Sequence, residues 1–212
     1  MALLLAAMAT AGCGGGDRPA PGPDAPRFDP AFLMNNDIWR EQRQAELLQP
    51  DGWTSLIGLH WLELKAHYIG SGSTSGIRLA MGPPRLGMVV HEAGRYWFTP
   101  ERGVAVQVDG KPVKGRIPFH ADDEPSPTMI TFDGGKGTLS LIHRGPRHAL
   151  RVRHADAPAR AHFGHLEYWP ADASWRITAR FMPHDAGKTL PVVDITGLTT
   201  EQANAGAIEF ER

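Results

Sequence analysis

The sequence of 212 residues contains a single cysteine, Cys13, so no disulfide bond can form within the chain. Its formal net charge is only −1, which excludes a strong overall attraction to nucleic acid or to an anionic membrane surface. It also lacks the run of about eighteen apolar residues that a transmembrane helix requires. We therefore expect no nucleic-acid partner and no spanning helix.

Specific motifs for metal binding, cofactor binding or catalysis are missing as well. The ten histidines form no His-Glu-x-x-His pattern, and the glycines of Gly70–Gly76 fit neither a Walker A loop nor a dinucleotide fingerprint. We therefore predict no metal site and no cofactor. An enzyme stays open as an alternative, a hydrolase in which His143, His154 and Asp156 carry out general acid–base chemistry.

Glycine and proline, by contrast, are abundant, with 24 and 18 residues, and they separate short apolar runs. From Trp53 onward these runs recur every ten residues or so, a spacing typical of a β-sandwich or a barrel-like stack. In "VQVDGKPV", Asp109-Gly110 predicts the turn of a hairpin. The fold class predicted is mainly β, with stacked antiparallel sheets.

One helix is expected before the strands. Asp29 is a good N-cap, and Pro30 suits the first helical position because its missing N–H would have no partner there. Pro50 ends the segment. We therefore divide the chain into residues 1–12, 13–28, a helix at 29–50 and a β-rich domain at 51–212, with a subdivision near residue 120.

The N-terminus explains the lone cysteine. Met1–Ala9 is apolar, small residues follow it, and Cys13 comes directly after them, in the manner of a bacterial lipoprotein signal. Such a signal predicts cleavage before Cys13 and lipidation of its side chain, and the Gly/Pro-rich residues 13–28 would form a flexible tether. No basic residue precedes Cys13, so we expect the true start upstream. The localisation predicted is the cell envelope, at the periplasmic face of the outer membrane.

The stretch richest in charged residues is "HRGPRHALRVRHADAPAR", from His143 to Arg160. If residues 147–154 form a strand, the period of two places Arg147, Arg151 and Arg153 on one face. Guanidinium groups in a row can hold a carboxylate, a phosphate or an acidic partner segment. Arg180 joins this candidate ligand-binding row if it lies nearby. The alternative is a solvated strand face paired with Asp and Glu on neighbouring strands.

Six tryptophans are present. Trp53, Trp61 and Trp175 stand in strand-like patterns, so we expect them in the core. Trp169, in "YWPAD", is expected at the surface, where Trp and Tyr side chains can stack on sugar rings or bind a partner.

Three stretches together resemble a bacterial family catalogued as domain of unknown function 1684. They are "PDGWTSLIGLHWLELKAHYIGSGSTSGIRL", "RGPRHALRV" with the following "APAR", and "WRITARFMPHDAGKT". The resemblance covers about residues 35–212 and implies no established activity. It also implies a further Tyr-Asn-Pro and Cys-Pro-rich segment that this sequence lacks, so we expect the C-terminus to be shortened.

A second similarity concerns the fold alone. Ile69-Gly70-Ser71 and Gly76–Leu79 resemble the start of a forkhead-associated (FHA) domain, and "VQVDGKPV" and "TMITF" stand where that fold has a hairpin and its next strand. This similarity implies an FHA-like β-sandwich. The arginine that binds phosphate in that family would fall at Ser71, so phosphothreonine binding does not carry over.

The sequence thus favours an exported lipoprotein that binds an anionic ligand or a protein partner without catalysis. The ligand would be held by Arg147, Arg151, Arg153 and Arg180. The hydrolase described above and an envelope scaffold with no small-molecule site remain the alternatives.

Overall fold

The computed structural model describes residues 29–194 and 197–211. The expected signal peptide, Cys13 and the tether lie outside these residues. Helix α1 spans Pro30–Leu47, and the side chain of its N-cap, Asp29, accepts a hydrogen bond from the amide of Ala31 at 3.0 Å. The predicted helix and its start are confirmed. None of the described helices is both long enough and apolar enough to cross a membrane.

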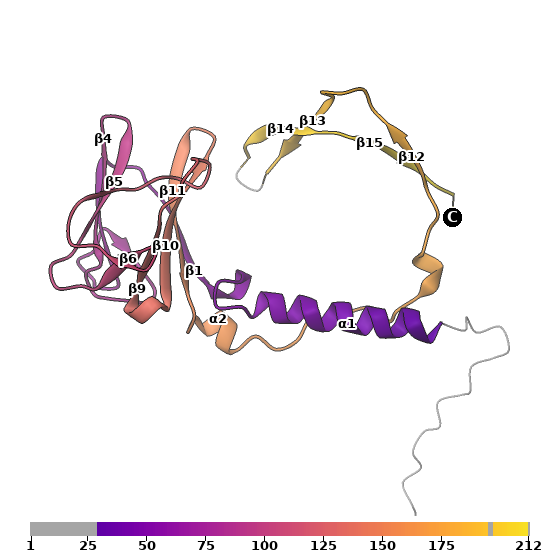
Figure 1. Ribbon diagram of the computed structural model, residues 1–212, viewed down its shortest axis with the longest axis horizontal. Coiled ribbons are helices and arrows are strands. Elements are labelled where there is room, and N and C mark those ends of the chain that lie inside the picture. Colours follow the sequence, from indigo (N-terminus) through magenta and orange to yellow (C-terminus); the bar gives the residue numbers. More distant parts are fainter. Residues whose placement is uncertain (1–28, 195–196, 212) are drawn as a thin grey trace, which may run out of the picture.

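Two β-sheets form the body of the protein (Figure 1). The larger sheet has six antiparallel strands in the order β1-β11-β10-β9-β6-β7. The smaller has five strands in the order β3-β2-β4-β5-β8, all paired antiparallel except β3, which runs parallel to β2. The larger sheet consists of β1 (Leu56–Trp61), β6 (Val106–Val108), β7 (Lys111–Pro112), β9 (Met129–Phe132), β10 (Gly137–Arg144) and β11 (Arg147–His154). The smaller consists of β2 (Ala66–Gly70), β3 (Ile77–Arg78), β4 (Gly87–Glu92), β5 (Arg95–Pro100) and β8 (Ile117–Pro118). The predicted mainly β class with stacked antiparallel sheets and one N-terminal helix is confirmed.

The core lies between these two sheets. Phe98 on β5 meets Phe119 edge-on, and the inner face of the larger sheet contributes Phe132, Leu141 and Leu150, all of them buried. Aromatic and branched apolar side chains that alternate along each strand bury one face of each sheet and stabilise the sandwich. The opposite face of the larger sheet carries polar side chains of β10 and β11 together with the buried Ile142 and Ala149.

Strands from both sides of residue 120 pair within the larger sheet, since β6 is hydrogen-bonded to β9. The body is therefore not divided at that position. The hairpin expected at Asp109-Gly110 joins β6 and β7, and both turn residues have positive φ, 50° and 72°. That backbone conformation is the one required by the tight turn of a two-residue hairpin.

Four short helical elements connect the longer ones. They are η1 (Trp53–Ser55) between α1 and β1, η2 (Asp133–Gly135) between β9 and β10, and α2 (Pro158–Ala161) and η3 (Ala173–Trp175) between β11 and a C-terminal arm. The arm contains two separate two-stranded sheets, β12 (Arg180–Pro183) with β15 (Gly206–Glu209), and β13 (Thr189–Val193) with β14 (Thr199–Ala203). In Figure 1 the arm begins near the far end of α1 and curves back, so that β13 and β14 lie on the side toward the body.

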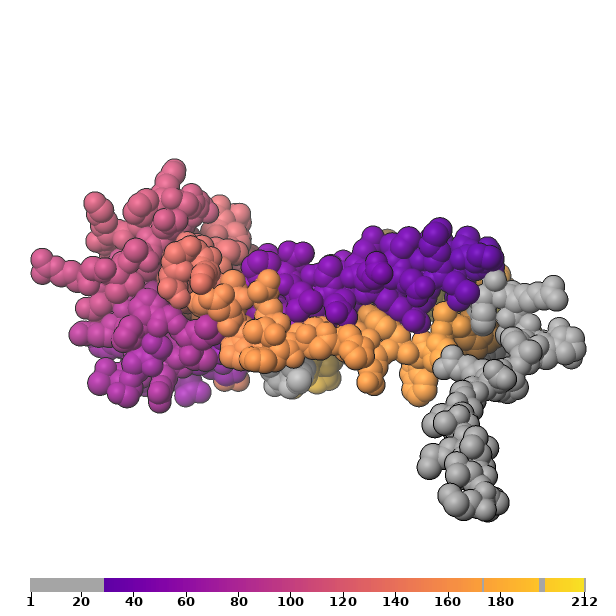
Figure 2. All heavy atoms as spheres, turned by 90° about the horizontal axis from the view of Figure 1, so that it is seen from below, coloured from indigo at the N-terminus to yellow at the C-terminus, as the bar shows by residue number. Residues whose placement is uncertain are grey.

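The chain that follows α2 lies along helix α1, as Figure 2 shows from below. The Gln44 side chain donates to the carbonyl of Gly164 and accepts from the amide of Leu166, both at 3.4 Å. Arg40, one turn earlier on α1, donates to the carbonyl of Trp169 at 2.8 Å. These contacts join the N-terminal helix to a segment more than a hundred residues away in sequence.

Candidate functional site

Strand β11 spans Arg147–His154 and presents its arginines on one face. Leu150 and Val152 point into the core and are fully buried, so the alternation of side chains sends Arg147, Arg151 and Arg153 to the outer face of the larger sheet. The structure thus places these three side chains as the period of two predicts.

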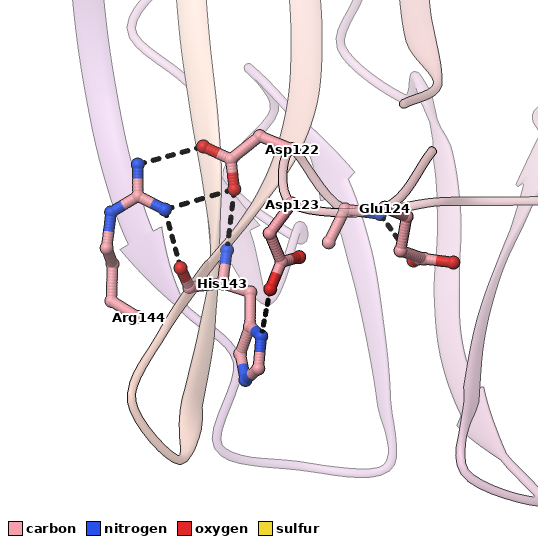
Figure 3. A network of polar contacts seen from close by, with 6 residues as sticks. Asp122, Asp123, Glu124, His143 and Arg144 are labelled. Atoms are coloured by element: carbon pink, nitrogen blue, oxygen red, sulfur yellow. Dashed lines mark hydrogen bonds and ion pairs between the residues drawn. The ribbon is translucent and has the colours of Figure 1, made fainter. Parts of the chain in front are cut away.

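Two of the neighbouring arginines already have partners on the protein. The Arg144 guanidinium donates to both carboxylate oxygens of Asp122, at 3.0 and 2.8 Å (Figure 3). The guanidinium carbon of Arg147 lies 3.9 Å from the centre of the Trp61 ring, in a cation–π contact. Since these contacts use one face or edge of each guanidinium, neither side chain is fully available to a ligand.

Arg180 does not lie in the row. It stands on β12 in the C-terminal arm, where it forms an ion pair with Glu209 on the paired strand β15. Figure 1 shows β12 well away from β11. The structure therefore does not bring Arg180 together with the three arginines of β11.

Arg151 and Arg153 remain, and they have no carboxylate partner among the residues that the structure describes. Both side chains are half-buried, and the Nε of Arg153 is buried with no hydrogen-bond partner. Burial lowers the pKa of Arg151 and the positive charge of Arg153 lowers it further, whereas the negative charge of Asp122 partly opposes this. Two adjacent cations without an ion-pair partner in contact form a favourable place for an anion.

Hydroxyl groups lie beside these two arginines. In the register of β10 with β11, Ser140 is directly opposite Arg151 and Thr138 is directly opposite Arg153. Residues opposite each other on antiparallel strands share a face, so all four side chains extend from the outer surface. Leu59 and Leu56 are the register partners of the same two arginines on β1. The candidate anion site therefore consists of Arg151, Arg153, Ser140 and Thr138, with apolar neighbours on one side.

The three residues of the hydrolase alternative are not brought together. His143 is paired with His148, whereas His154 is paired with Gly137, six residues away along β10. At about 3.4 Å per residue this separation is roughly 20 Å. His154 is 1% exposed and donates from Nε2 to Asp133 at 3.0 Å, and Asp156 forms an ion pair with Lys136 at 2.7 Å. Each residue therefore has its own structural partner.

A row of stacked rings connects the two sheets at one end of the sandwich, and the sequence reasoning missed it. His91 stacks on Tyr96, Tyr96 contacts His148, and His148 stacks on His143, with ring centres 4.4, 4.7 and 4.1 Å apart. Nδ1 of His143 then donates to Asp123 at 2.7 Å (Figure 3). The sequence contains a signal for one of these contacts. A hairpin turn at Gly145 makes His143 and His148 neighbours on adjacent strands.

The same network fixes the acidic loop after β8. Burial raises the pKa of Asp122, but the Arg144 guanidinium and the amide of His143 outweigh it and hold that pKa below its usual value. Glu124 accepts from the amide of Ala121 and from Nδ1 of His120, both at 2.7 Å. Within the described part of the chain, no three His, Cys, Asp or Glu side chains are grouped so that they could hold a metal ion.

Comparison with known proteins gives a family match and a fold neighbour. Residues 161–212 match the model of a family described as protein of unknown function (DUF1684). The resemblance inferred from the sequence is thereby confirmed for this C-terminal segment, which includes Ala179-Arg180-Phe181. No curated protein matches the chain.

Among solved structures, the N-terminal FHA domain from EssC, a component of the bacterial Type VII secretion apparatus, is similar at a TM-score of 0.36 and 7% sequence identity. The alignment covers 46% of this chain and 46% of that chain.

Proposed function

We propose that this protein is a noncatalytic binding module of the bacterial cell envelope, and that it holds an anionic ligand or an acidic group of a protein partner on Arg151 and Arg153. The observation that carries the proposal is the adjacency of two half-buried guanidinium groups that have no carboxylate partner among the described residues. Burying cations without a counterion costs free energy, and a bound anion would offset that cost.

The neighbouring hydroxyls support an oxyanion as the bound group. Ser140 and Thr138 stand opposite the two arginines, and a hydroxyl can donate to the same oxygens that a guanidinium contacts. Both carboxylate and phosphate oxygens can accept hydrogen bonds from this set of donors. The proposal therefore covers both chemistries.

The binding test uses inorganic phosphate, sulfate and citrate as probes, in thermal unfolding experiments at constant ionic strength. An anion that binds only the folded protein raises its midpoint of unfolding. We expect this rise in the wild-type protein and its loss in the double variant Arg151→Gln/Arg153→Gln.

The matched control is Arg78→Gln/Arg95→Gln, which removes the same charge from two exposed arginines of the smaller sheet. This control should respond to the probes as the wild type does. If all three proteins respond equally, or none responds, the anion site is refuted and a scaffold without a small-molecule site becomes the better interpretation.

Attachment to the envelope is proposed from the sequence around Cys13. An apolar N-terminal run, small residues and a Gly/Pro-rich tether support lipidation at this cysteine. The intact mass of the protein purified from the membrane fraction of its host tests this. A mass that begins at Cys13 and includes acyl groups, lost in Cys13→Ser, is the expected result, and an unlipidated mass would remove the membrane from the proposal.

A further inference from the structure

A second candidate site lies between helix α1 and the segment that runs along it. Two cavities of about 840 and 410 Å³ adjoin there, and both are lined by Arg40 and Tyr168. Volumes of this size are typical of sites for small molecules. We call the smaller cavity and its rim the aromatic groove, defined by Asn36, Trp39, Arg40, Tyr168, Trp169 and Trp175.

Aromatic side chains form the rim of this groove. Trp39 meets Tyr168 edge-on with ring centres 5.6 Å apart, and it keeps 53% of its surface exposed. Trp169 is 91% exposed and Trp175 is 64% exposed. The expectation that Trp175 belongs to the core is therefore wrong, whereas the expectation that Trp169 lies at the surface is confirmed. Exposed indole faces are favourable surfaces for a flat or weakly polar ring.

Polar atoms beneath the rim are left without partners. They are Oδ1 of Asn36, Nε of Arg40 and the hydroxyl of Tyr168, each of them buried with no hydrogen bond. Arg40 is held in place by its hydrogen bond to the Trp169 carbonyl and by its position 5.0 Å from the centre of the Tyr168 ring. Unpaired polar atoms are costly, so three of them behind one groove call for an explanation, and a bound ligand is one.

The chemistry of these three atoms restricts the ligand. Since the three atoms are buried, a ligand reaches them only when their side chains turn toward the groove. Oδ1 of Asn36 then requires a donor, Nε of Arg40 requires an acceptor, and the Tyr168 hydroxyl can serve as either. A simple anion offers only acceptors, and an acyl chain offers neither. A ligand that carries several hydroxyl groups offers both, and a sugar combines such hydroxyls with apolar C–H faces that stack on indole.

We propose that the aromatic groove is a carbohydrate-binding site for the rings of a glycan, with Trp39 and Trp169 as stacking surfaces. The adjoining larger cavity extends along α1, so a chain of several sugar units can follow the helix. Gln44, in the lining of the larger cavity, joins α1 to Gly164 and Leu166 and so holds the two sides of that cavity together. This site is separate from the anion site and does not depend on it.

The test is a titration of the full chain with chitohexaose and with cellohexaose. Isothermal titration calorimetry and tryptophan fluorescence measure the binding. We expect binding of at least one of them and a rise of about tenfold or more in Kd for Trp169→Ala, the loss of one stacking surface. The matched control is Trp53→Ala. Trp53 is 73% exposed and lies on η1, outside the groove, so its removal should leave the Kd unchanged.

A second variant separates binding from folding. Tyr168→Phe keeps the ring that contacts Trp39 and Arg40 and removes only the unpartnered hydroxyl. We expect weaker glycan binding with an unchanged midpoint of unfolding.

Absence of binding to both oligosaccharides overturns the proposal, as does an equal Kd for the Trp169→Ala and Trp53→Ala variants. A protein that is dimeric in solution and becomes monomeric in Trp39→Ala would also overturn it, because the groove would then be an interface between copies.

Discussion

His143 and His148 stack face to face across the β10–β11 hairpin, with ring centres 4.1 Å apart and planes 10° from parallel. His148 is the inner ring of the pair, since it also contacts Tyr96 on the other sheet. Burial lowers the pKa of His148, and the proximity of His143 lowers it further. Aromatic and imidazole rings therefore join the two sheets at this end. Their packing is most stable when His148 is neutral.

The stability of the protein should fall as the pH decreases below about 6.5, the ordinary pKa of histidine. A lowered pKa in the folded state means that the unfolded chain binds the proton more readily, so stability is fully present above this pH and is lost below it. His60 and His67, whose pKa values burial also lowers, add to the loss. Urea unfolding at pH 7.5 and pH 5.5 measures the difference.

In His148→Phe the fall in stability between these two pH values should be smaller, because the ring stays and the titrating group is gone. The charged and titratable groups that act on His148 are His143, Asp123, His91 and Glu124, and all of them remain in the variant. His165→Phe, at an exposed histidine, is the control and should behave as the wild type. An equal loss of stability in His148→Phe and in the wild type would show that His148 does not cause the pH dependence.

Asp122→Asn should destabilise the fold by roughly 1–2 kcal/mol. Asp122 receives two hydrogen bonds from Arg144 and one from the amide of His143, and the amide variant can accept only part of this set. Asp51→Asn, on the turn after α1, removes the same charge at an exposed position and should change the free energy of unfolding little. Chemical denaturation at pH 7 compares the two, and similar values would show that the Asp122 network contributes nothing.

Gly137→Ala should destabilise the protein by about 1–3 kcal/mol through overpacking. A Cβ at Gly137 would stand 2.2 Å from the buried ring of Phe132, so the ring would have to move. At Gly115 nothing lies within 4 Å, which makes Gly115→Ala the control. Thermal unfolding of the two variants gives the answer, and a Gly137→Ala protein as stable as the control would mean that the Phe132 ring relocates freely.

Arg151→Gln should be at least as stable as the wild type in buffer without oxyanions. Burial and the neighbouring Arg153 disfavour the charge at this position, so its removal relieves a cost instead of breaking an ion pair. Arg144→Gln, which loses the Asp122 partner, should by contrast be less stable. Urea midpoints measure both effects. A clear destabilisation by Arg151→Gln would indicate that its guanidinium has a structural role.

The sequence by itself determined the local features of this protein. The capping residue Asp29 and the following Pro30 set the start of α1, the Asp109-Gly110 pair set a hairpin, and the period of two set the face of Arg147, Arg151 and Arg153. Each of these depends on residues close together in the chain, where backbone preference and side-chain alternation act directly.

Tertiary structure decided which of these side chains remain available. Arg144 is paired with Asp122, Arg147 with Trp61, and Arg180 with Glu209, all through strand register or loop position. Trp53, expected in the core, is instead at the surface, because the short 3-10 turn η1 that carries it is not part of either sheet. A residue's partner on another strand depends on how the strands are ordered and aligned, and the local pattern of one strand does not contain that information.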